Sequence, residues 1–137
     1  MNAVEVHRIQ EVSRREYRSL LQYAREASPF ASGADRLVRD AVMRIAKEES
    51  TALESFGEVL ESLRVTLPYL GSFPIGFTDL NFVTIRHLLP KLVAEQSRDL
   101  VKLEAEAMAL SDVIARAAVQ RLAELHRRHL KELESLG

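Results

Sequence analysis

Acidic and histidine side chains interrupt the apolar stripes of four predicted helices, each near the middle of its helix. Glu16 falls at the centre of the first stripe, between Val12 and Leu20. Glu48 and Glu49 flank the centre of the second stripe. Helices of similar length that pack side by side bring their midpoints to one level, so these groups can meet in one polar layer. The interrupting residues are Glu16, Glu48, Glu49, Glu95, Gln96, His126 and His129.

A metal ion is one chemical reason for such a layer. A buried carboxylate without a partner is costly, so it takes up a proton, pairs with a cation or coordinates a metal. Carboxylates and imidazoles from facing helices can hold one or two iron or manganese ions. The alternative is a structural network, for example Glu16 with an arginine or His129 with Glu48. The candidate metal ligands are Glu16, Glu49, Glu95, His126 and His129, with Glu48 and Gln96 as alternates.

The complete di-metal pattern of helical bundles is absent. It takes one glutamate from each of two helices and a Glu-x-x-His pair from each of the other two. Ala52 follows Glu49 by three residues, where the histidine belongs. In the last helix His126 and His129 have that spacing, but no glutamate stands at the first position. With His126 in the histidine place instead, Ala123 takes the glutamate place. The sequence therefore predicts a reduced ligand set.

Four helices are predicted, over residues of about 4–27, 34–65, 79–110 and 112–136. Thr78 or Asp79 can cap the third helix and Ser111 the fourth. The first and last connections are short, so each joins an antiparallel pair. The middle connection of about 13 residues, at roughly 3.3 Å per residue, can just traverse the bundle. Both an up-down-up-down order and an order with a long middle crossover remain open.

Composition places the chain among ordinary globular proteins. Its 137 residues suit one domain, residues 1–137, and 47% of them are hydrophobic. The net charge of −1 offers no basic field for nucleic acid. No uncharged apolar run approaches the roughly 18–20 residues of a membrane span, and no signal peptide is recognisable. With no cysteine in the chain, we expect a cytoplasmic protein that binds neither membrane nor nucleic acid.

The middle connection is rich in aromatic residues, unlike a plain linker. It holds four of the chain's eight aromatic side chains, namely Tyr69, Phe73, Phe77 and Phe82. Exposed apolar segments of this kind are a liability unless something covers them. We expect this segment to pack on the helices, or else to contact a partner.

Short segments around the interrupting residues resemble the ferritin-like superfamily, particularly bacterioferritin and rubrerythrin relatives. REYRSLLQYAREASPF is similar to a first helix whose ligand glutamate, here Glu16, precedes a Gln-Tyr pair. AKEESTALESF resembles the second ligand segment, with Glu49 matching its glutamate and Ala52 departing from its histidine. LVAEQSRDL can supply Glu95, and LAELHRRHLKELE resembles the last ligand segment, with His126 or His129 as its histidine.

The resemblance implies an all-α, ferritin-like four-helix bundle with a long connection between its second and third helices. It also implies a homo-oligomer, a dimer in the simplest case, and it gives no reason to expect haem. Two functions follow. The first is a structural or interaction protein without catalysis, on a scaffold whose metal site is incomplete. The second is an iron- or manganese-binding oxidoreductase or metal-handling protein that uses the reduced site.

Overall fold

Helices make up most of the chain in the computed structural model, which describes residues 1–137. The prediction of an all-helical protein is confirmed. None of the helices combines the length and the hydrophobicity that a membrane span requires. Five α-helices and one 3-10 helix follow one another as α1 (Ala3–Tyr17), α2 (Leu20–Ala27), α3 (Asp35–Ser62), η1 (Ile75–Leu80, the 3-10 helix), α4 (Ile85–Ala109) and α5 (Val113–Ser135).

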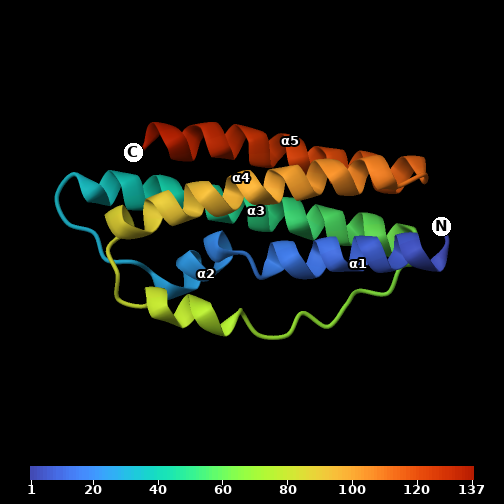
Figure 1. The fold of residues 1–137 in the computed structure, drawn as a ribbon, viewed down its shortest axis with the longest axis horizontal. Coiled ribbons are helices and arrows are strands. Elements are labelled where there is room, and N and C mark those ends of the chain that lie inside the picture. The colour runs from blue at the N-terminus through green and yellow to red at the C-terminus, as the bar shows by residue number, and fades with distance from the viewer.

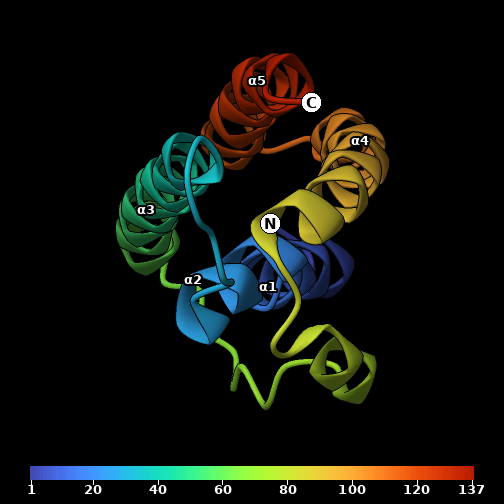
Figure 2. The ribbon, with the colours of Figure 1, turned by 90° about the vertical axis from the view of Figure 1, so that its left-hand side faces the viewer.

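The helices lie along one long axis and run in two directions (Figure 1). α1 and α2 follow each other in the same direction, and α3 returns antiparallel to them. The chain between α3 and α4, which includes η1, then runs back along the molecule. As a result, α4 starts at the same end as α3 and points the same way, whereas α5 is antiparallel to α4. Viewed along the axis, α1 with α2, α3, α4 and α5 surround a common interior (Figure 2).

Two apolar clusters fill this interior, and a polar layer separates them. One cluster joins α1 to the later turns of α3 and α4 and to the first half of α5. The other joins α2 to the first halves of α3 and α4 and to the end of α5. Between them, on all four sides, lie buried polar side chains, as the interrupted stripes predict. These are Glu16, Glu49, Gln96, His126 and His129.

The first predicted helix is two helices. Arg18, with φ −111° and ψ 24°, ends α1. Ser19 then begins α2 as its N-cap, with a side chain that accepts a hydrogen bond from the Gln22 amide at 3.2 Å. The prediction of one continuous helix over residues 4–27 was therefore wrong. The hydroxyl of a serine can accept a hydrogen bond from a backbone amide three residues later, and this favours the start of a new helix at the serine.

The third helix begins later than predicted. Thr84, not Thr78 or Asp79, caps α4 by accepting a hydrogen bond from the His87 amide. Phe82 lies just before it with φ +65° and a fully exposed side chain, so it belongs to no helix stripe. Asp112 rather than Ser111 caps α5, through the amide of Ala115.

The segment between α3 and α4 packs on α1 and α2, but only in part. Arg18 donates a hydrogen bond to the Gly71 carbonyl at 2.8 Å, and Tyr23 packs against the rings of Phe73 and Phe77. The side chain of Tyr69 remains 88% exposed. The predicted packing therefore holds for the side chains of Phe73 and Phe77, while Ile75 between them is 88% exposed.

Candidate metal centre

Three carboxylates from three helices converge on one nitrogen of a histidine from a fourth. The Nε2 atom of His126, on α5, lies 3.1 Å from Oε2 of Glu16 on α1 and 3.2 Å from Oδ2 of Asp99 on α4. It also lies 3.4 Å from Oε1 of Glu49 on α3. These four residues are called the His126 cluster below. Glu16, Asp99 and His126 alone offer three ligand atoms that lie within 4.8 Å of one another.

The other nitrogen of His126 is held by the backbone. Nδ1 lies 3.0 Å from the carbonyl oxygen of Leu122, one turn earlier on α5. Because a carbonyl can only accept, Nδ1 carries the proton. In the neutral ring, the lone pair of Nε2 then points at the three carboxylates. A metal-ligating histidine has this arrangement, since its second nitrogen donates to a carbonyl or carboxylate and so fixes the tautomer.

A second set of hydrogen bonds orients Glu49. Its Oε2 atom accepts from Nε2 of Gln96 at 2.7 Å and lies 2.8 Å from Nδ1 of His129. The remaining oxygen, Oε1, is the one that faces His126. His129 also contacts Oε2 of the half-exposed Glu48 at 2.7 Å, through its Nε2. The ring of His129 therefore joins the buried Glu49 to Glu48 near the surface and helps to fix the orientation of the Glu49 carboxylate.

Arg15 lies on the side of the cluster nearest to solvent. Its Nε donates to Oδ1 of Asp99 at 2.9 Å, and its guanidinium is 3.4 Å from Oε1 of Glu16. It also pairs with Glu106 at 3.5 Å. Arg15 thus binds one oxygen each of Asp99 and Glu16, and the other oxygens, Oδ2 and Oε2, face His126.

Burial and mutual charge separate the acidities of the cluster. Burial raises the pKa of Glu16 to about 8, against the opposing hydrogen bond with His126 and with help from the charge of Asp99. Burial also opposes ionisation of Asp99, but hydrogen bonds with His126 and Glu16 lower its pKa to about 2. For His126, hydrogen bonds to Asp99 and Glu16 outweigh burial and raise its pKa well above the usual value.

No protein-family model, curated protein or solved structure matches this chain. The contacts among Glu16, Glu49, Asp99 and His126 are therefore the observations that indicate a site.

The structure brings together most of the residues expected from the sequence. Glu16, Glu49 and His126 meet in the cluster, while His129 and Gln96 support Glu49 from behind. Glu48 is bound to His129 at the surface.

Glu95 lies outside the cluster, although the sequence suggested it as a ligand. Its Oε1 accepts a hydrogen bond from the Leu20 amide at 3.1 Å, at the start of α2. Burial raises the pKa of Glu95, and the charge of Asp99 adds to that effect. Asp99, one turn later on α4, takes the place expected for Glu95. Sequence reasoning missed Asp99, although its position three residues after Gln96 and four before Leu103, both buried, puts it on the inner face.

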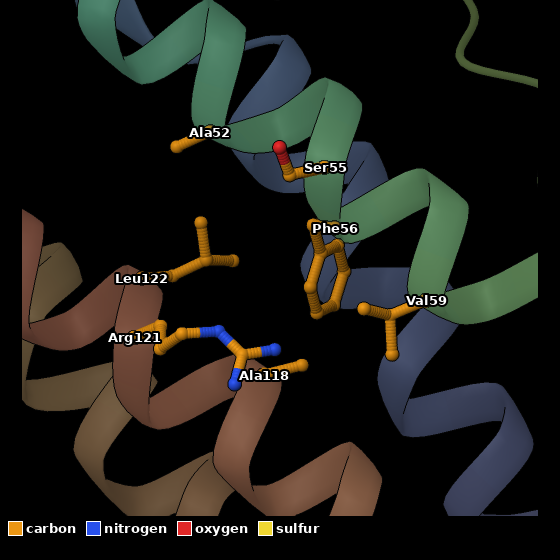
Figure 3. Close-up of a pocket in the computed structure, with 7 residues that line it drawn as sticks. All are labelled: Ala52, Ser55, Phe56, Val59, Ala118, Arg121 and Leu122. Atoms are coloured by element: carbon orange, nitrogen blue, oxygen red, sulfur yellow. The ribbon is translucent and has the colours of Figure 1, made fainter.

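An apolar groove between α3 and α5 is separate from the cluster. It has a volume of 240 Å³, and Figure 3 shows Phe56 of α3 and Leu122 of α5 facing it. Ala52, which stands where the resemblance requires a histidine, also lines this groove. None of the four cluster residues does.

Proposed function

We propose that this protein binds one divalent iron or manganese ion in the His126 cluster. The ligands are Nε2 of His126 and carboxylate oxygens of Glu16, Glu49 and Asp99. One observation carries the proposal: Nδ1 of His126 is bound to a backbone carbonyl, and Nε2 faces three carboxylates from three other helices.

The distances suit a shared ion best for His126, Glu16 and Asp99, whose ligand atoms all lie within 4.8 Å of one another, whereas Glu49 is outside that set and has to shift toward the ion to bind it. A metal about 2.1 Å from each ligand atom holds neighbouring atoms ~3.0 Å apart at right angles and ~3.4 Å apart in a tetrahedron. The three contacts of Nε2 measure 3.1, 3.2 and 3.4 Å. A single N–H group cannot donate well to three oxygens at once. A cation in their midst satisfies all three.

The charges and ligand types fit as well. A divalent ion together with the Arg15 guanidinium balances the three carboxylates. Three oxygen ligands with one imidazole suit manganese and iron better than a thiolate-preferring metal such as Cu(I). Such an ion can supply electron transfer or a polarised bound water, and the role of this chain is to hold it in a nearly dry interior. The protein is accordingly proposed as a metal-handling protein or a metal-dependent oxidoreductase.

We further propose that the fold is a four-helix bundle of ferritin-like topology, in which α1 and α2 count as one broken helix. The parallel course of α3 and α4, joined by a segment that runs back along the bundle, supports this order. Bundles of this kind carry metal sites on facing helices at mid-height, where the His126 cluster lies.

A second candidate is an ion-pair network that works without a metal and stabilises a structural or interaction protein. Arg15 favours this role, because it already pairs with Asp99 and Glu16. In that case His126 is an imidazolium ion and Glu16 keeps a proton. Such a network need not stabilise the fold strongly, because the cost of removing its charges from water can equal the attraction between them.

Metal content separates the two candidates. The untagged protein, expressed with iron and manganese, is analysed by mass spectrometry as wild type, Glu16→Gln and Glu58→Gln. The first substitution removes a ligand, whereas Glu58 is an exposed glutamate of α3. Metal binding predicts about one ion per chain in the wild type and the control, and a loss in Glu16→Gln. Substoichiometric metal that Glu16→Gln leaves unchanged overturns the metal proposal and supports the ion-pair network.

A further inference from the structure

A small polar cavity adjoins the His126 cluster where α1 ends and α2 begins. Its volume is 80 Å³, and no hydrophobic side chain lines it. The break between α1 and α2 places Ser19 in its wall, opposite α4. The lining residues are Arg15, Ser19, Glu95, Arg98, Asp99 and Lys102.

Asp99 is the one residue of the His126 cluster that lines this cavity. The side chain of Asp99 is 12% exposed, whereas those of Glu16 and His126 are 2% and 3% exposed. Asp99 lines the cavity with Oδ1 bound to Arg15, and its Oδ2 faces His126. The carboxylate thus forms the boundary between the cavity and the buried cluster.

Positive charge predominates at the cavity. Arg98 and Lys102 are exposed, and neither forms an ion pair, since Arg15 is the cation that binds the acidic groups here. Glu95 also lines the cavity and accepts a hydrogen bond from the Leu20 amide, and the charges of Arg98 and Lys102 oppose the rise that burial causes in its pKa. The lining thus holds three cations and two carboxyl groups. Arg15 compensates Asp99. The two unpaired cations therefore attract anions to a recess with a polar wall.

We propose that this cavity admits small inorganic anions to the metal centre, with Arg98 and Lys102 at its mouth and Arg15 at its inner wall. The inference rests on the proposed metal centre. One water needs about 10–15 Å³ of cavity volume of this kind, so a recess of 80 Å³ has room for several waters or for a small inorganic anion.

Azide is the probe, and Co²⁺ is the reporter ion because its visible absorption responds to its ligands. The protein is loaded with Co²⁺, its metal stoichiometry is measured, and azide is titrated at constant ionic strength. The test variant is Arg98→Ala/Lys102→Ala. The control is Arg128→Ala/Lys131→Ala, which removes the same charges from exposed positions of α5, a helix that does not line the cavity.

The expected result is a saturable change in the cobalt spectrum of the wild type and the control. Azide affinity should fall about tenfold in the test variant, the combined effect of two partly screened charges. If Co²⁺ binds but azide leaves the spectrum unchanged, or if the two double variants bind azide equally, the anion inference is overturned while the metal proposal stands. If Co²⁺ itself fails to bind, both are overturned.

Discussion

Two carboxyl groups that contact the same imidazole nitrogen differ widely in acidity. The pKa of Glu16 is about 8, chiefly because the side chain is buried, while hydrogen bonds hold the pKa of Asp99 at about 2. In the metal-free protein at neutral pH, Glu16 therefore holds a proton that it can donate to Asp99. His126, whose hydrogen bonds to both groups raise its pKa, holds another.

Metal binding should release protons and strengthen as pH rises. Because the ion needs Glu16 as a carboxylate and Nε2 of His126 as a lone pair, it must displace both protons. Below pH 8 the affinity should fall by up to about tenfold per pH unit for each displaced proton. Calorimetry at pH 7 in two buffers of different ionisation enthalpy measures the release. An affinity without pH dependence between 6 and 8 contradicts the assigned ligands.

Neutralising the two acids should affect folding differently. In metal-free protein at pH 7, Glu16→Gln replaces a neutral acid with a neutral amide, so the free energy of unfolding should change by less than about 1 kcal/mol. Asp99→Asn removes the partner of Arg15 and His126. Since the lowered pKa of Asp99 stabilises the fold above its unfolded pKa, we expect a loss of about 2–3 kcal/mol, which disappears as pH falls toward 2.

Urea denaturation with a chelator present measures both free energies. A Glu16→Gln protein that is as unstable as Asp99→Asn contradicts the assignment of the proton to Glu16.

The sequence predicted most members of the polar layer, but not their roles. The pattern of apolar stripes is enough to identify the polar residues that interrupt them, namely Glu16, Glu49, Gln96, His126 and His129. Which oxygen of Glu49 faces His126 depends on Gln96 and His129, from two other helices. Asp99 was missed because it stands beside Ser97 and Arg98 in an outwardly polar stretch. Its burial comes from α1 and α5, which no local pattern specifies.

At the scale of elements, the break between α1 and α2 shapes the site most. It separates Glu16, at the end of α1, from the Leu20 and Leu21 side chains that begin the second apolar cluster. It also turns Ser19 toward α4, beside Asp99. The sequence does contain a local indication of this break. Ser19 and Gln22 have the spacing of a capping box, but the apolar stripe continues across it and favours one helix.

Replacing Ser19 should loosen this junction. In Ser19→Ala the Gln22 amide loses its hydrogen bond, so the free energy of unfolding should fall by about 1 kcal/mol. Ser97→Ala is the matched control, an exposed serine inside α4 where alanine is the better helix former. Equal stability of both variants would show that Ser19 does not act as a cap.

At the scale of the whole molecule, two apolar clusters hold the helices together, one toward each end of the bundle. The polar layer lies between the clusters and adds contacts among α1, α3, α4 and α5. These clusters contain 14 and 13 buried residues, so we expect the helices to stay associated without a metal. The order of the helices was open from the sequence, because a connection of about 13 residues fits either topology. The packing of α3 against α4 and α5, which are far from it in the sequence, selects the topology with the long crossover.

Removing the metal should lower the melting temperature but leave the helices formed. An ion present at 100 times its dissociation constant adds about 2.7 kcal/mol to stability. For a chain of this size that corresponds to roughly 10 °C. Circular dichroism with and without a chelator checks both parts. A large loss of helix on chelation would mean that the apolar clusters do not suffice.

Anomalous diffraction from crystals grown with Mn²⁺ tests the central claim most directly, because it locates the ion. We predict one strong peak about 2.1 Å from Nε2 of His126, surrounded by oxygens of Glu16, Glu49 and Asp99. We expect no such peak in crystals of Glu16→Gln. Manganese found only at exposed carboxylates, with the Arg15 guanidinium and the His126 ring still paired to Asp99, would contradict the account and leave a structural ion-pair network in its place.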